Sequence, residues 1–269
     1  MLTFPAFDPV AVSIGPVAIR WYALAYLAGF VLGWRYCLSL AKKNPKGPTP
    51  QHYDDFLSWA VIGTVLGGRI GYVLFYQAEL YAEQPLEIFK IWHGGMSFHG
   101  GALGVILAAY LFTRKNKISF FSFTDLLAVV TPIGLGLGRL ANFVNGELFG
   151  RVTDVPWGIV FPRGGDLPRH PSQLYEAGLE GLVLFIIMAI LVRQDRLRAR
   201  AGFLSGVFLT GYGAFRFMVE FFREPDAQLG YLYAGATMGQ LLCLPMMLFG
   251  LYLILRSERR TKKRDHVLH

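Results

Sequence analysis

Long stretches of mostly apolar residues recur along the 269-residue chain, and they constrain its fold more than any other feature. A helix needs about 20 such residues to cross the hydrocarbon core of a bilayer. Apolar and aromatic residues make up 54% of the chain and charged residues only 16%, well below the charged share of soluble domains. The stretches are continuous rather than alternating, which argues against a membrane barrel. The sequence therefore predicts an all-α polytopic membrane protein.

We expect about seven transmembrane helices in a single membrane-embedded domain, residues 1–269. The predicted spans are residues 17–40, 56–78, 95–113, 123–143, 172–192, 203–221 and 236–255. Residues 1–19 contain no Lys or Arg, so we do not expect a cleavable signal peptide. Cys37 and Cys243 lie in apolar stretches and are expected to be core residues rather than a disulfide or a metal site.

Basic residues indicate the orientation of these helices. Of the 26 Lys and Arg residues, 16 follow the first, third, fifth and last predicted spans, whereas 6 lie in the connections on the opposite side. Since cytoplasmic connections are enriched in Lys and Arg, the N-terminus should lie outside and the C-terminus in the cytoplasm. Residues 145–171 then form an external loop region. The basic tail fits a topology signal that contacts anionic lipid better than a nucleic-acid site.

Polar residues inside predicted spans are costly and are functional candidates by default. With this orientation, most of them fall in the outer half of the membrane: Tyr22, Arg69, His99, Arg139, Asn142, Glu176, Glu180, Tyr212, Arg216, Glu220 and Arg223. Helical spacing places the last four on one helix face, and Arg139 and Asn142 on another. Because a guanidinium group binds phosphate through parallel hydrogen bonds, these arginines predict an anion site near the outer surface. Arg35 and Asp125 lie near cytoplasmic ends, where we expect them to reach the interface.

Structural roles compete with this hypothesis. Arg216 and Glu220 have the spacing of an i, i+4 ion pair. Arg69 could form a buried pair with Glu176 or Glu180. The glycines beside Arg69 and Arg139 are typical of close helix packing. His99 lies among glycines at the depth of the arginines, where an imidazole can act as a general base, although a lone histidine is more often structural.

Other chemistries are poorly supported by the sequence. We find no metal-binding motif of the HExxH type and no GxSxG nucleophile motif. The glycine runs match neither a dinucleotide-binding fold nor a phosphate-binding loop. We therefore expect no metal and no cofactor. A transporter or flippase for an anionic lipid would also use intramembrane arginines, but it would more often show internal repeats. An intramembrane protease or phosphatase lacks support.

Several blocks together resemble the bacterial prolipoprotein diacylglyceryl transferases. The strongest is GRLANFVNGE at residues 138–147. Further matches are Trp21 with Tyr22, MSFHGG at residues 96–101, HPSQLYE at 170–176, YGAFR at 212–216 and EFFR at 220–223. Because the blocks extend from the first predicted span to the sixth, the resemblance covers nearly the whole chain.

The resemblance implies a multi-pass enzyme of the bacterial inner (plasma) membrane with its active site facing the outer or periplasmic side. Such an enzyme transfers the diacylglyceryl group of phosphatidylglycerol to the lipobox cysteine of a prolipoprotein signal peptide. A thioether forms and glycerol phosphate leaves, as the first step of lipoprotein maturation. The expected partners are these two substrates and membrane lipids, without nucleic acid.

The same resemblance, with the chemistry of the residues, assigns roles. The thiolate is the nucleophile, and cations stabilise the charge that develops on the leaving phosphate. The predicted catalytic residues are His99, Arg139 and Arg216, with His99 either the base for the thiol or a positioning residue. Arg139 is also the firmest lipid-binding position. The other predicted substrate-binding residues are Tyr22, Asn142, Glu147, Gly150, Tyr212, Glu220 and Arg223. Among these, Glu147 and Glu220 are expected to fix the arginines or to bind headgroup hydroxyls.

Overall fold

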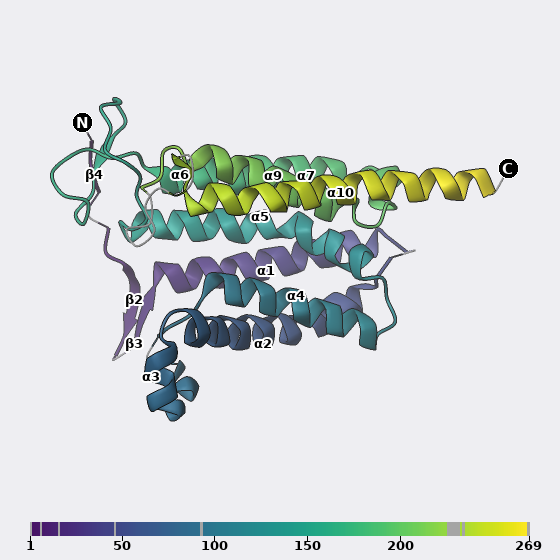
Figure 1. Cartoon of the computed structure of the whole chain (residues 1–269), viewed down its shortest axis with the longest axis horizontal. Coiled ribbons are helices and arrows are strands. Elements are labelled where there is room, and N and C mark those ends of the chain that lie inside the picture. Colours follow the sequence, from purple (N-terminus) through teal and green to yellow (C-terminus); the bar gives the residue numbers. More distant parts are fainter. Residues whose placement is uncertain are drawn as a thin grey trace. The chain divides into compact units, whose positions relative to one another are not determined.

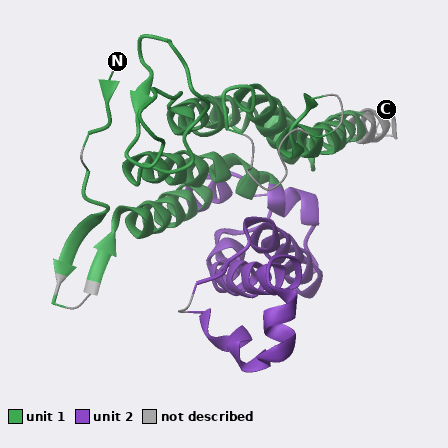
Figure 2. Cartoon of the chain, turned by 60° about the vertical axis from the view of Figure 1, so that its left-hand side comes forward, with its two compact units in different colours: residues 1–37, 125–269 green, residues 38–124 purple. Residues whose placement is uncertain are grey.

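A computed structural model of the chain describes residues 2–5, 7–15, 17–45, 47–91, 94–224, 232 and 235–267. Most of this chain is helical (Figure 1). It divides into two compact units, one formed by residues 1–37 and 125–269 and the other by residues 38–124 (Figure 2). The prediction of a mainly helical fold is therefore confirmed.

Five helices are long and apolar enough to cross a membrane. They are α1 (Trp21–Lys42), α2 (Pro50–Phe75), α5 (Phe120–Val144), the continuous helix Ser172–Leu191 and the segment Met238–Glu258 of α10 (Met238–Val267). The helix Ser172–Leu191 consists of α6 (Ser172–Glu176), a π-helical stretch η3 (Ala177–Val183) and α7 (Leu184–Leu191). The lengths and apolar compositions of these five helices indicate a multi-pass membrane protein.

The other two predicted spans are also helical, but shorter or less apolar. Helix α4 (Phe98–Lys115) has 18 residues, and His99 and the basic Arg114 and Lys115 at its ends lower its hydropathy. Helix α9 (Phe203–Val219) has 17 residues. The count of seven spans and the direction of the chain across the membrane therefore stay predictions.

The first helix begins later than the sequence predicts. Residues Val17–Arg20 form strand β3, which pairs antiparallel with β2 (Val10–Ile14) instead of extending α1. Gly15 makes the turn between them with a φ of +60°, a conformation that favours glycine. A second short pair joins β1 (Leu2–Thr3) in parallel to β4 (Ile159–Val160). The predicted start of the first span at residue 17 is thus wrong by four residues.

In the unit of residues 38–124, α2 packs on α4 through small residues, and short helices α3 (Ala78–Glu83) and η1 (Pro85–Phe89) follow α2. A Cβ atom at Gly63 would lie 2.7 Å from the Gly104 carbonyl oxygen, and one at Gly71 would lie 2.8 Å from the Gly100 Cα. Glycine at these positions lets the two backbones approach closely. The close-packing role considered for the glycines near Arg69 is therefore confirmed.

In the larger unit, a short helix α8 (Asp195–Arg198) precedes α9, and a buried carboxylate holds the start of α9. Asp125 is 3% exposed and accepts hydrogen bonds from the Gly202 amide at 2.8 Å and from the Ser205 amide and hydroxyl, both at 2.7 Å. A carboxylate near the first turn satisfies amides that have no partner within the helix. The expectation that Asp125 reaches the membrane interface is wrong.

Replacing Asp125 by alanine should lower the free energy of unfolding by about 2–3 kcal/mol, because three donors lose their buried acceptor. The midpoint of thermal unfolding in detergent micelles measures this loss. Asp195→Ala is the control, because Asp195 lies at the surface with its side chain 86% exposed and forms a surface ion pair with Arg198. Equal midpoints for the two variants would contradict the capping role.

Candidate active site

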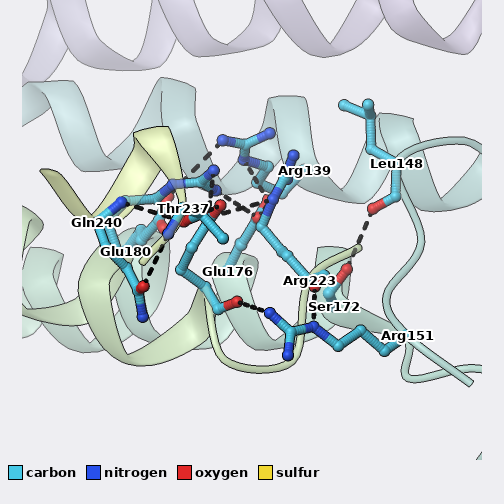
Figure 3. Close-up of polar contacts among 11 residues, drawn as sticks. Arg139, Leu148, Arg151, Ser172, Glu176, Glu180, Arg223, Thr237 and Gln240 are labelled. Atoms are coloured by element: carbon cyan, nitrogen blue, oxygen red, sulfur yellow. Dashed lines mark hydrogen bonds and ion pairs between the residues drawn. The ribbon is translucent and has the colours of Figure 1, made fainter. Parts of the chain in front are cut away.

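Three arginines from two helical segments and the turn after α9 converge on one buried carboxylate, that of Glu176 (Figure 3). Arg139 on α5 lies with Nε 2.7 Å from Glu176 Oε2. Arg216 on α9 and Arg223 just beyond α9 each place Nη1 2.7 Å from Oε1. Glu176 is 0% exposed and ends α6, which begins the continuous helix Ser172–Leu191. The cluster therefore joins α5, α6 and α9 at one point.

A second carboxylate, Glu220, completes the cluster on the α9 side. Its Oε2 lies 2.7 Å from Arg216 Nη2 and 3.5 Å from Arg223 Nε. Its Oε1 accepts a hydrogen bond from the Thr237 hydroxyl at 3.0 Å. Thr237 also caps the start of α10, because its hydroxyl accepts the Gln240 amide hydrogen at 3.3 Å. The start of α10 is thereby tied to the arginine cluster.

Close contact between α5 and the π-helical stretch brings Arg139 beside Glu180. A Cβ atom at Gly136 would lie 3.2 Å from the Cα of Gly181, so only small residues fit there. Gly136 precedes Arg139 by about one turn, and Gly181 follows Glu180 directly. Arg139 Nη2 lies 3.9 Å from Glu180 Oε2. A π-helical turn inside a longer helix is often found at functional sites.

Arg139, Arg216 and Arg223, three of the arginines predicted to form an anion site, do come together, but glutamates balance them. Three guanidinium groups face Glu176, Glu180 and Glu220, so the formal charges cancel. Arg139 has the most exposed side chain of the three arginines, at 20%. Among the described residues, its Nη1 makes no hydrogen bond or ion pair. Arg139 can therefore offer a free edge of its guanidinium group to an anion while it stays attached to Glu176.

The structure unites Arg139, Arg216, Glu220 and Arg223, as the predicted site requires. The alternative of an Arg216–Glu220 ion pair is confirmed as well. Arg216 contacts Glu220 and Glu176 at the same time. Tyr212, one turn before Arg216 on α9, interacts electrostatically with Glu180 and Arg216. The central position of Glu176 was not predicted, although this residue ends the HPSQLYE block.

Tyr22, Asn142 and Glu147 form a neighbouring polar group. The Asn142 amide donates to Glu147 Oε1 at 2.9 Å, and the Asn145 amide donates to the same oxygen at 3.2 Å. The Tyr22 hydroxyl lies 3.2 Å from that of Tyr26 and also interacts with Asn142. Among the described residues, Glu147 pairs with no arginine, so its predicted role of fixing the arginines is wrong. Two side-chain amides orient it instead.

Gly150 lies where three backbone segments meet. Its amide donates to the His170 carbonyl at 2.8 Å, and the next amide, of Arg151, donates to the Phe222 carbonyl at 2.9 Å. A Cβ atom at Gly150 would lie 2.9 Å from His170 Cβ and would collide with the Phe222 carbonyl oxygen. Glycine therefore permits the close approach of the 145–171 region to the end of α9.

Arg151 and His170 stabilise the same region. Arg151 Nε donates to the Arg223 carbonyl at 2.6 Å and so attaches the region to the residue that binds Glu176. His170 Nδ1 lies 3.1 Å from the Tyr175 hydroxyl, which accepts a hydrogen bond from Trp157 Nε1 at 2.7 Å. Partial burial lowers the pKa of His170 below its ordinary value, against an opposing effect of Asp154. The lowered pKa favours the neutral imidazole near pH 7.

Arg69 has a different role from the one predicted. Its side chain is buried, and all the hydrogen bonds that its guanidinium group makes to described residues go to backbone carbonyls: to Ile88 at 2.8 Å, to Gly95 at 3.2 Å, and to Glu87, Lys90 and Gly94. Both the predicted anion contact and the alternative pair with Glu176 or Glu180 are therefore wrong. Arg69 therefore ties η1 to the segment that leads into α4, because carbonyls of both occupy its donors.

His99 lies in the first turn of α4 with an exposed side chain. Ser97 caps this helix by accepting the Gly100 amide hydrogen at 3.2 Å. His99 belongs to the unit of residues 38–124, whereas the arginine cluster belongs to the other unit. The convergence of His99 with the arginines therefore stays a prediction. Within the described part of the chain, no group of three or more His, Cys, Asp or Glu residues is arranged to hold a metal ion.

Comparison with known proteins identifies the family. Residues 9–256 match the family model described as prolipoprotein diacylglyceryl transferase. A phosphatidylglycerol–prolipoprotein diacylglyceryl transferase of Azospirillum brasilense is 60% identical over 261 residues, which cover 96% of this chain and 97% of the relative. One of the same name from Paramagnetospirillum magneticum is 59% identical over 263 residues, covering 97% and 98%. The chain belongs to the prolipoprotein diacylglyceryl transferase family.

Proposed function

We propose that the protein transfers the diacylglyceryl group of phosphatidylglycerol to the lipobox cysteine of a prolipoprotein signal peptide. A carbon–sulfur bond forms, the carbon–oxygen bond to the phosphate breaks, and glycerol phosphate leaves. The observation that carries this proposal is the convergence of Arg139 and Arg216 on Glu176 in a chain whose relatives bear this activity in their names. The cluster supplies cations that suit the phosphate of the lipid.

The arginines act on the charge of the leaving group. As the carbon–oxygen bond breaks, negative charge grows on the phosphate oxygens, and cations held in place beforehand stabilise it. Arg139 binds the phosphate with the open edge of its guanidinium group, and Arg216 supports it from α9. Glu176 holds both guanidinium groups in position before the lipid arrives. Little reorganisation is then needed when the charge develops.

The neighbouring residues bind the rest of the lipid headgroup. The Tyr22 hydroxyl and the Asn142 amide lie next to Glu147. These polar groups bind the hydroxyls of the glycerol headgroup. Tyr212, Glu220 and Arg223 orient the arginines. Gly150 lets the external region approach the end of α9 closely.

In the membrane, the protein has seven helices, with the N-terminus outside and the C-terminus in the cytoplasm of a bacterial inner membrane. Helices α4 and α9 are the two spans beyond the five long apolar ones. The arginine cluster then lies at the level of the outer-leaflet headgroups, and residues 145–171 face the periplasmic side. This orientation rests on the distribution of Lys and Arg.

The proposed activity is tested with purified protein in vesicles of phosphatidylglycerol and a synthetic lipobox peptide. The peptide should gain the mass of one diacylglyceryl group without added metal, and glycerol phosphate should appear in equal amount. Vesicles of phosphatidylcholine are the control. No mass gain by folded protein would refute the proposal.

His99→Asn should lower the rate of transfer by about 10²- to 10⁴-fold if His99 takes the thiol proton. Asparagine keeps a hydrogen-bonding group but cannot titrate near neutral pH. The rate is measured as a function of pH for both proteins. A reduced rate with an unaltered pH profile assigns His99 a positioning role, and an unchanged rate excludes it from the reaction.

A further inference from the structure

Glu180 is a buried carboxylate to which no described residue donates a hydrogen bond. Its side chain is 0% exposed, and among the residues that the structure describes, none donates a hydrogen bond to either of its oxygens. The nearest cationic atom is Arg139 Nη2, 3.9 Å from Oε2. Since buried polar groups are nearly always hydrogen-bonded, such a carboxylate requires an explanation.

The other carboxylates of the site are occupied. Glu176 is shared by three arginines, and Glu220 binds Thr237 and Arg216. Glu147 accepts two side-chain amides at one oxygen. Glu180 alone among these four keeps lone pairs on both oxygens free of described donors. It is therefore the carboxylate of the cluster best able to accept a proton.

Charged and titratable groups on several helices lie around Glu180. Those that interact with it electrostatically are Arg139 on α5, Glu176 on α6, Tyr212 and Arg216 on α9, Arg223 after α9 and Cys243 on α10. The two arginines proposed to bind the phosphate are among them. A proton taken up by Glu180 is thus taken up next to the leaving group.

We propose that Glu180 accepts the proton of the attacking lipobox thiol, an inference that rests on the proposed function. The S–H proton moves to a Glu180 oxygen, and the sulfur forms its bond to the glycerol carbon. The electron pair of the broken carbon–oxygen bond goes to the phosphate. Glu180 loses one negative charge as the phosphate gains one, so the total charge of the site is unchanged. Arg139 lies next to Glu180 and, in the proposed complex, next to the phosphate. His99 then has the positioning role.

The arrangement also sets an order of binding. Arg139 is partly exposed, whereas Glu180 beside it is fully enclosed. We expect a lipid phosphate to turn Arg139 Nη2 away from Glu180 while Nε stays on Glu176, and so to open Glu180 to the thiol. The proton acceptor therefore becomes accessible only after the lipid has bound.

The test compares two peptides that differ in one atom. With a cysteine peptide, Glu180→Gln should lower kcat by about 10²- to 10⁴-fold and leave the KM for phosphatidylglycerol nearly unchanged. With a selenocysteine peptide, which is ionised at neutral pH and needs no base, the variant should work within about tenfold of the unmodified protein. Glu79→Gln, at an exposed position on α3, should behave as the unmodified protein with both peptides.

Equal losses with the two peptides would show a structural role and overturn the proposal, as would full activity of Glu180→Gln with the cysteine peptide. If Glu180→Gln does not fold, Glu180→Asp keeps a carboxylate at a greater distance and should slow only the cysteine reaction. An equal slowing of both reactions would then overturn the proposal. Failure of the unmodified protein to modify either peptide would instead refute the proposed function.

Discussion

Replacing Arg139 by lysine should lower the rate of diacylglyceryl transfer by at least about 100-fold, while the protein still folds and inserts. Lysine keeps the positive charge but offers a point charge instead of a planar fork. In the protein, Arg139 uses Nε to hold Glu176, while no described residue binds Nη1, which we expect to bind the phosphate. A lysine ammonium cannot serve both partners with this geometry. The rate of mass gain of a lipobox peptide measures the effect.

Arg163→Lys is the matched control, since Arg163 is an exposed arginine in the 145–171 region of the same unit. This variant should retain the activity of the unmodified protein. Full activity of Arg139→Lys would refute recognition of the phosphate by a guanidinium fork. A comparable loss in both variants would show that the effect is not specific to the cluster.

The second large effect is expected for Glu176→Gln. The substitution keeps the shape of the side chain but removes the charge that three arginines share. Removing one partner of a buried ion pair typically costs about 3–5 kcal/mol, because the remaining charge stays buried without compensation. We expect a loss of stability of this size together with a loss of activity, measured as the unfolding midpoint in micelles and as the transfer rate.

Glu224→Gln provides the comparison for Glu176→Gln. Glu224 also pairs with an arginine, Arg169, but its side chain is 47% exposed, so its loss should cost less than about 1 kcal/mol. If Glu176→Gln and Glu224→Gln were equally stable and active, Glu176 would not be the centre of the cluster. Comparing the two variants distinguishes the effect of a buried carboxylate shared by three arginines from that of a single surface ion pair.

The sequence predicts the helices and the participating arginines well, because both depend on local chemistry. Apolar stretches locate every long helix, and helical spacing places Arg216, Glu220 and Arg223 on one face, where the structure has them paired. The start of α1 was predicted wrongly because apolar residues 17–19 suit a strand as well as a helix. The pairing with β2 decides between the two.

The partners of buried charges were harder to predict. Depth along a helix does not show which neighbour a side chain faces, so Arg69 was placed with the arginines of the anion site. In the structure its donors bind carbonyls of η1 and of the loop that follows η1. Glu176 is a functional candidate from its depth and a possible partner of Arg69, but the sequence does not identify it as the residue that three arginines share. Its contact with Arg139, Arg216 and Arg223 depends on the packing of α5, α6 and α9, which no local pattern encodes.

A structure of the protein with bound phosphatidylglycerol would locate the lipid phosphate. If Arg139 and Arg216 bind it, its oxygens lie within hydrogen-bonding distance of both guanidinium groups, with Arg139 turned from Glu180 toward the lipid. A phosphate bound elsewhere, with Arg139 still paired with Glu176 and Glu180, would refute this assignment.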